Sequence, residues 1–170
     1  MRTLETAALT LEPQVAAHAL EMFPVLCDPA IYEYENQPPA SLEWLRKRYE
    51  HLESRQSADG TQQWLNWVIR LPGSGLIGYV QATVQGGGRA SIAYELASAF
   101  WGKGLARVAV EAMIAELGSR YGVSELSAVL KRDNQRSRRL LERLGFALVA
   151  VEANAIEPDE IMMQRPLRAP

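Results

Sequence analysis

Residues 100–107, FWGKGLAR, place a glycine on each side of Lys103, just before a long helical pattern of apolar residues. Glycine is a poor helix former, so its presence at this junction needs a reason. The first N–H groups of a helix have no partner within the helix, and the helix dipole makes this end positive. Glycine lets a ligand approach these groups closely. The stretch therefore predicts a cradle for a diphosphate, to which Lys103 adds charge.

Two common phosphate-binding motifs do not fit this stretch. A Walker A loop requires G-x-x-x-x-G-K-[ST], but Gly104 follows Lys103, and Ala97 stands at the position of the first glycine. A Rossmann fingerprint needs its third glycine where Arg107 stands, and it follows a first strand rather than three strands of antiparallel type. Taken alone, the GKG turn is equally consistent with a purely structural turn.

Three strands precede the stretch, at 62–71, 76–84 and 90–97, and the glycine-rich turns between them predict an antiparallel meander. Farther upstream we expect a strand at 4–11, a helix at 14–22 with Pro13 at its first position, and a helix capped by Ser41 that runs to about residue 55. The loop between these two helices is broken by prolines and rich in tyrosine and glutamate.

Downstream, the apolar residues of 103–121 share one stripe of a helix that Gly118 or Gly122 ends. A strand at 125–130, a helix capped by Asn134 and stopped by Gly145, and strands at 146–151 and 161–166 follow. The order β-α-α-β-β-β-α-β-α-β-β, without repeat or linker, predicts a single domain over residues 1–170. Its class is α+β, with three layers and a mixed, mostly antiparallel sheet of about six to seven strands flanked by helices.

Composition excludes several other classes. The chain has 170 residues, of which 48% are hydrophobic and 22% charged, and its net charge of −2 gives no general attraction to nucleic acid or membrane. The basic run at 131–139, KRDNQRSRR, has no interleaved aromatic residues, which argues against nucleic-acid binding. Without a signal-like segment or a long apolar run, a cytoplasmic protein is expected. Cys27 is expected to be buried, and one cysteine with two distant histidines predicts no metal site.

Residues 91–117, SIAYELASAFWGKGLARVAVEAMIAEL, and 133–146, DNQRSRRLLERLGF, resemble the GNAT family of acetyl-CoA-dependent N-acetyltransferases. The family signature Q/R-x-x-G-x-G/A reads WGKGLA here, with Trp101 in place of Gln or Arg. Trp101, the N-x-x-S of Asn134 and Ser137, and the L-G-F at 144–146 resemble in particular the branch that contains the ribosomal-protein (alanine) N-acetyltransferases.

The resemblance implies acetyl-CoA as the cosubstrate and implies where it binds. In the family, the strands expected here at 90–97 and 125–130 separate, and the pantetheine arm lies between them. The residues implied in cofactor binding are Leu96 and Ala97 for the pantetheine and thioester, Trp101, Gly102, Lys103, Gly104, Leu105, Ala106 and Arg107 at the pyrophosphate turn, and Asn134.

The reaction that the resemblance implies needs a base for the amine and an acid for the leaving thiolate. Many members use a tyrosine as the acid, but Leu141 occupies that position, and Ser137, one turn earlier, is the candidate in its place. A common position for the base holds Ser91 here, so Glu95, farther along the same strand, is the first candidate. Glu157, Glu33 and Glu35 are the alternatives, and any of the four could act through water.

The loop after the first helix usually forms the wall of the acceptor site in this family. The resemblance therefore implies that Tyr32, Glu33 and Glu35 of this loop, together with Ser91, bind the substrate. With Asp28, the two glutamates indicate an acidic groove for a cationic acceptor. We therefore expect acetyl transfer to a primary amine, either a protein N-terminus or a small amine, by a monomer or homodimer. The alternative is a catalytically weak acyl-CoA-binding module of the same fold, because the usual glutamate and tyrosine are absent.

Overall fold

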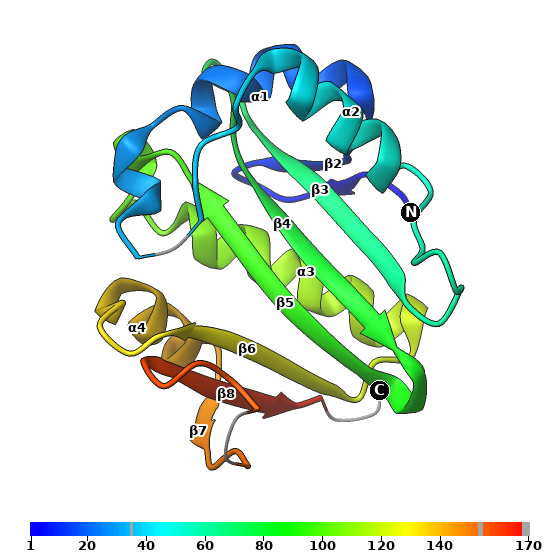
Figure 1. The fold of residues 1–170 in the computed structure, drawn as a ribbon, viewed down its shortest axis with the longest axis vertical. Coiled ribbons are helices and arrows are strands. Elements are labelled where there is room, and N and C mark those ends of the chain that lie inside the picture. Colours follow the sequence, from blue (N-terminus) through cyan, green and yellow to red (C-terminus); the bar gives the residue numbers. More distant parts are fainter. Residues whose placement is uncertain (35, 153–154, 168–170) are drawn as a thin grey trace.

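The structure, a computed structural model, describes residues 1–34, 36–152 and 155–167. In these residues a single sheet holds eight strands in the order β1-β2-β3-β4-β5-β6-β8-β7, with helices on both faces (Figure 1). The strands are β1 (Leu4–Glu5), β2 (Thr10–Pro13), β3 (Gln63–Leu71), β4 (Gly75–Gln85), β5 (Arg89–Leu96), β6 (Glu125–Lys131), β7 (Ala147–Val149) and β8 (Glu160–Pro166). The α-helices are α1 (Ala19–Leu26), α2 (Leu42–Leu52), α3 (Leu105–Tyr121) and α4 (Gln135–Arg143).

The sheet is of the mixed, mostly antiparallel kind that the sequence predicts. Strands β3, β4 and β5 form the expected meander, and the one parallel pair among the described strands is β5 with β6. The strand count is higher than predicted because residues 4–11 form two short strands instead of one. Thr6 closes the turn between them: its hydroxyl donates to Leu9 O at 2.7 Å and accepts from Leu9 N at 3.0 Å.

Two further expectations near the N-terminus are wrong. Pro13 does not start a helix but ends β2 opposite Trp67, because pairing with β3 extends this far, and α1 begins only at Ala19. Cys27 is exposed rather than buried. It is the C-cap residue of α1, one position beyond the buried Leu26, so its side chain lies outside the face that packs on the sheet.

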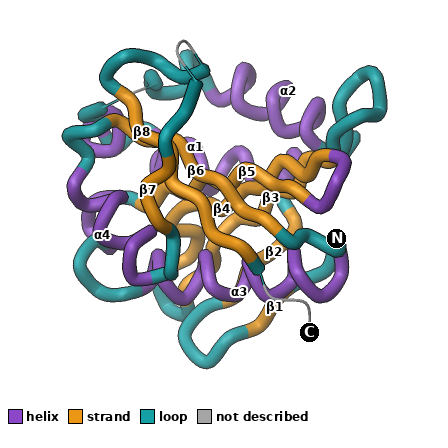
Figure 2. The backbone as a smooth tube through the Cα atoms, turned by 90° about the horizontal axis from the view of Figure 1, so that it is seen from below, coloured by secondary structure: helices purple, strands orange, loops and turns teal. Residues whose placement is uncertain are grey.

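The helices divide the core between the two faces of the sheet. Helices α1 and α2 pack on one face and α3 and α4 on the other, and Figure 2 shows α2 and α3 on opposite sides of the strands. The buried residues of α3 include Ala109, Val110, Met113, Ile114 and Leu117, which is the stripe that the sequence predicts. Gly122, at φ 64°, ends this helix. None of the helices in the described residues is long and apolar enough to cross a bilayer.

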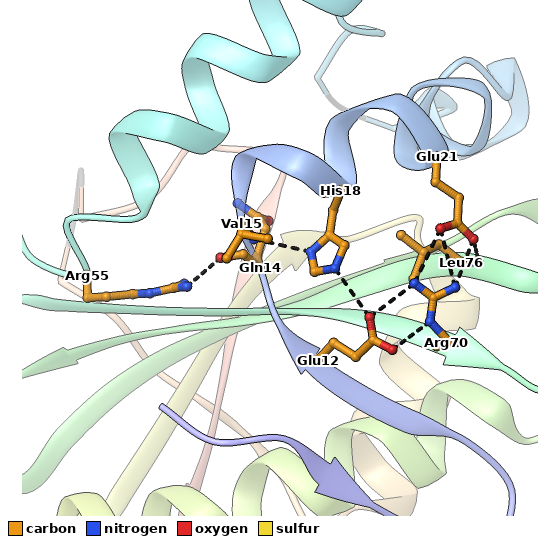
Figure 3. Close-up of polar contacts among 8 residues, drawn as sticks. All are labelled: Glu12, Gln14, Val15, His18, Glu21, Arg55, Arg70 and Leu76. Atoms are coloured by element: carbon orange, nitrogen blue, oxygen red, sulfur yellow. Dashed lines mark hydrogen bonds and ion pairs between the residues drawn. The ribbon is translucent and has the colours of Figure 1, made fainter.

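An ion-pair network fastens α1 to the edge of the sheet (Figure 3). The Arg70 guanidinium of β3 donates to Glu12 Oε1 on β2 at 2.6 Å and to Glu21 Oε1 on α1 at 3.0 Å. Glu21 also accepts from the N–H of Leu76 on β4 at 2.8 Å. The hydrogen bonds from Arg70 hold the pKa of both carboxyl groups below the usual range. This network therefore joins three strands and a helix.

Replacing Arg70 by methionine is expected to lower the free energy of unfolding at neutral pH by about 1.5–3 kcal/mol, since two carboxylates lose a charged donor. Because the folded protein lowers the pKa of Glu12 and Glu21, this stabilisation is present above their ordinary pKa of 4.5 and is lost as pH falls through the lowered values. Urea titrations at neutral and acid pH would measure both effects. The control Arg46→Met removes an exposed pair with Glu50 and should change little. An equal decrease in the free energy of unfolding at both pH values would contradict the ionic role of Arg70.

Candidate active site

The sheet opens between its two parallel strands. β5 pairs with β6 only from Arg89 to Ser91, opposite Glu125 to Ser127, whereas its pairing with β4 continues to Leu96. The second half of β5 therefore has no neighbour on one side, and Figure 1 shows the two strands separating. A cavity of about 510 Å³ fills the opening, and residues from β5, β6 and the first turns of α3 and α4 line it.

The free edge of β5 presents backbone groups to this cavity. Ala97 N donates to Ile77 O at 3.0 Å, so the alternation of an antiparallel ladder turns the N–H and C=O of Leu96 and Tyr94 away from β4. Leu96 O accepts from the Trp101 indole at 2.8 Å, which leaves the Leu96 N–H toward the opening. The Ala97 carbonyl accepts from Phe100 N, so both backbone groups of Ala97 are engaged. The Leu96 N–H is therefore oriented for the role expected of this pair, whereas both backbone groups of Ala97 already have partners.

The start of α3 has the features of an anion cradle. Gly102 and Gly104 adopt φ values of 72° and 76°, and no atom lies within 4 Å of a Cβ built on either. Gly104 is the N-cap and provides no side-chain cap; its carbonyl accepts from Val108 N at 3.2 Å. The N–H groups of residues 105–107 precede this first helical bond and point out of the helix start. The residues present therefore fit a diphosphate.

Lys103 does not line the cavity. Its ammonium donates to Ala99 O at 2.8 Å and lies 5.3 Å from the centroid of the Phe100 ring. The arginines that line the cavity are Arg107 at the start of α3 and, on α4, Arg136, Arg139 and Arg143. The spacing i, i+3, i+7 places the three side chains of α4 on one helical face.

Ser137 faces a tyrosine hydroxyl across the opening. Asn134 Oδ1 accepts from Ser137 N at 3.0 Å, which confirms Asn134 as the N-cap of α4 and fixes Ser137 in its first turn. The Ser137 hydroxyl lies 2.8 Å from the hydroxyl of Tyr94, which comes from β5. Burial raises the pKa of Tyr94 to about 12. Leu141, where the family tyrosine is absent, is fully buried.

Glu95 also lines the cavity but belongs to the other face of the sheet. Successive side chains of a strand alternate, so Glu95 lies on the side of α1 and α2 when Tyr94 faces α3 and α4. It is opposite Tyr79 in the register of β4 and β5. Burial, and next the charge of Glu95, raise the pKa of Tyr32 to about 12. The cavity thus connects a carboxylate on one face of the sheet with a hydroxyl pair on the other.

The remaining predicted residues lie around this cavity or away from it. Glu33 pairs with Arg136 at 3.4 Å, and the Arg136 guanidinium lies 3.4 Å from the centroid of the Trp101 ring. Asp28 accepts from Ser98 N at 2.7 Å, so this carboxylate fastens the loop rather than facing an acceptor.

Three of the expected acceptor or base residues are not brought to the cavity. Ser91 lies at the closed end of the opening, beside Ser127, and Glu157 is an exposed residue of the β7–β8 connection. The Tyr32 hydroxyl donates to Leu26 O at 2.6 Å, and Tyr32 is not among the residues that line the cavity. Glu35 falls outside the described residues. Within the described part of the chain, no group of three or more histidine, cysteine, aspartate or glutamate side chains could hold a metal ion.

The sheet therefore opens between two parallel strands, beside a glycine-lined start of α3 whose N–H groups fit an anion. Residues 8–147 match the family described as acetyltransferase (GNAT) domain, so the chain belongs to the GNAT family. An uncharacterized N-acetyltransferase, YoaA of Bacillus subtilis, is 36% identical over 72 residues. That match covers 42% of this chain and 40% of YoaA.

Solved structures share the fold over almost the whole chain. The RimL ribosomal L7/L12 alpha-N-protein acetyltransferase in complex with coenzyme A superposes with a TM-score of 0.83 at 18% identity and covers 99% of both chains. The ribosomal-protein-S5-alanine acetyltransferase of Vibrio fischeri gives a TM-score of 0.78 at 17% identity, over 96% of both chains. At these identities the likeness concerns the fold, and it confirms the predicted fold class.

Proposed function

We propose that this protein transfers an acetyl group from acetyl-CoA to a primary amine, and that residues 1–170 form one domain for this reaction. The observation that carries the proposal is the cavity between β5 and β6, which joins the anion cradle of α3 to Glu95 on the opposite face. A bound thioester would enter from the α3–α4 side, and an amine would reach it from the α1–α2 side. The two substrates would therefore meet at the free edge of β5.

Each part of the cavity has a defined task in this proposal. Leu96 N–H and the cradle at residues 102–107 would hold the pantetheine and the diphosphate, and Arg139 and Arg143 would compensate phosphate charge. Acetyl-CoA, when bound, supplies the activated acetyl group. Glu95 would take the proton of the attacking ammonium, directly or through water, and the Ser137 hydroxyl would donate a hydrogen bond to the leaving sulfur.

We favour an α-amine, on a protein N-terminus or a small molecule, over a lysine side chain. An α-amine has a pKa of about 8 and a lysine amine of about 10.4, so the former demands less of a single carboxylate. Two structures with this fold are those of an alpha-N-protein acetyltransferase and an alanine acetyltransferase. Thiol release from acetyl-CoA with a panel of α-amines and ε-amines tests the proposal. CoA binding without thiol release for any amine would favour the alternative, a binding module.

Replacing Gly104 by valine is expected to weaken CoA binding at least about tenfold, or 1.4 kcal/mol, because the side chain would occupy the cradle. Gly73 provides a matched control: its φ is 77°, nothing lies within 4 Å of its Cβ position, and it sits in the β3–β4 turn. Gly73→Val should show the same backbone strain with unchanged CoA affinity. Calorimetric titration measures the CoA affinity of each variant. Equal affinities in the two variants would show that the start of α3 does not bind the diphosphate.

A further inference from the structure

The contact between Tyr94 and Ser137 is not explained by the roles given so far. It joins β5 to α4 across the opening of the sheet, with 2.8 Å between the two hydroxyl oxygens. Tyr94 lines the cavity and packs partly against the core. Packing alone does not require that the phenol hydroxyl contact the hydroxyl of Ser137, which also lines the cavity.

The chemistry of the two groups favours one direction for this hydrogen bond, in which Tyr94 is the donor. A phenol is the stronger acid and therefore the better donor, whereas an aliphatic hydroxyl is the better acceptor. The other acceptor near the Tyr94 hydroxyl is the Ser137 carbonyl at 3.3 Å, which is the longer contact and belongs to the backbone ladder of α4. The distance allows either hydroxyl to donate; with Tyr94 as the donor to Ser137 Oγ, the Ser137 hydrogen is left for an acceptor in the cavity.

We propose that Tyr94 is a positioning residue for acetyl transfer: its phenol donates to Ser137 Oγ and so directs the Ser137 hydroxyl hydrogen at the leaving sulfur. The inference rests on the proposed function. The helix itself supplies no phenol at Leu141; in this chain a strand supplies a phenol that acts through the serine.

The proton balance makes Tyr94 a hydrogen-bond donor rather than an acid. The ammonium gives its first proton to Glu95 before it attacks, and the nitrogen loses its second proton as the C–N bond forms and the C–S bond breaks. The sulfur leaves as a thiolate, and the second nitrogen proton reaches it through the solvent. Because burial raises the pKa of Tyr94 to about 12, proton transfer from Tyr94 to the sulfur is uphill. The same raised pKa keeps the phenol protonated throughout the range in which an α-amine titrates.

A double-mutant cycle with Tyr94→Phe, Ser137→Ala and the double variant tests this role. Tyr94→Phe keeps the ring, and we expect it to lower kcat about tenfold while the KM for acetyl-CoA and the melting temperature stay near their original values. In the Ser137→Ala background the same change should have no further effect on kcat. Tyr121→Phe, at the far end of α3, is the matched control and should retain full activity.

Three results would overturn the role of Tyr94. The first is an unchanged kcat in Tyr94→Phe, and the second is an equal loss of kcat whether residue 137 is serine or alanine. The third is a loss of kcat accompanied by a higher KM for acetyl-CoA and a lower melting temperature, which would indicate a packing role. Failure of the proposed function is distinct: the original protein would then bind CoA by calorimetry but release no thiol with any amine, and the role of Tyr94 would fall with it.

Discussion

Replacing Ser137 by alanine is expected to lower kcat about 100-fold or more, with acetyl-CoA binding almost unchanged. The hydroxyl would stabilise charge that exists on the sulfur only while the thioester breaks, so its loss raises the barrier and not the dissociation constant. The N-cap bond that holds this turn of α4 uses the Ser137 backbone N–H, which alanine keeps. Steady-state kinetics and calorimetric titration of CoA on the same preparation separate the two quantities.

Ser119→Ala is a suitable control, because this serine also lies on a helix and its hydroxyl only donates to Ala115 O at 2.8 Å. It should leave kcat and CoA affinity as they are. A Ser137→Ala protein with full turnover would reduce Ser137 to a small residue packed near the helix start. A parallel loss of kcat and CoA affinity would instead indicate a collapsed cavity.

The sequence predicted those parts of the fold and site that depend on local chemistry. The two glycines of FWGKGLAR predicted backbone dihedrals that differ from those of a helix, and both glycines have positive φ at the start of α3. The apolar stripe of 103–121 and the Asn134 cap likewise depend on neighbours within a few residues, and both are present in the structure. Thr6 shows the limit of this reasoning. A single side chain closes a turn inside an apparently continuous strand, which periodicity does not reveal.

The rest of the site depends on how strands that are far apart in the sequence pair with one another, and it was not predictable. Tyr94 and Ser137 are far apart in the sequence, and only the separation of β5 from β6 lets them meet. The same register carries Ser91 to the closed end of the opening, although it lies on the same strand as Glu95. Ala97 is adjacent to Leu96, yet the ladder with β4 occupies its N–H. Which residues face a cavity is therefore a property of strand pairing.

Glu95→Gln is expected to remove most activity at neutral pH, about 100-fold, and to recover part of it at high pH. Glutamine keeps the size and polarity of the side chain but cannot accept a proton from the ammonium. As the pH rises above the pKa of the amine, about 8 for an α-amine, the free amine becomes abundant and the base is needed less. The ratio of original to variant rates should therefore fall with increasing pH.

A pH–rate profile of both proteins with one α-amine and one ε-amine measures this ratio. Glu125→Gln is the control, because Glu125 begins β6 at the closed end of the same opening, opposite Arg89. Parallel profiles with equal rates for Glu95→Gln would contradict the assignment, and the test would then pass to Glu157 and Glu35. If none of the three carboxylates matters, the amine must arrive deprotonated. That result would still favour an α-amine, since a lysine amine is almost fully protonated at neutral pH.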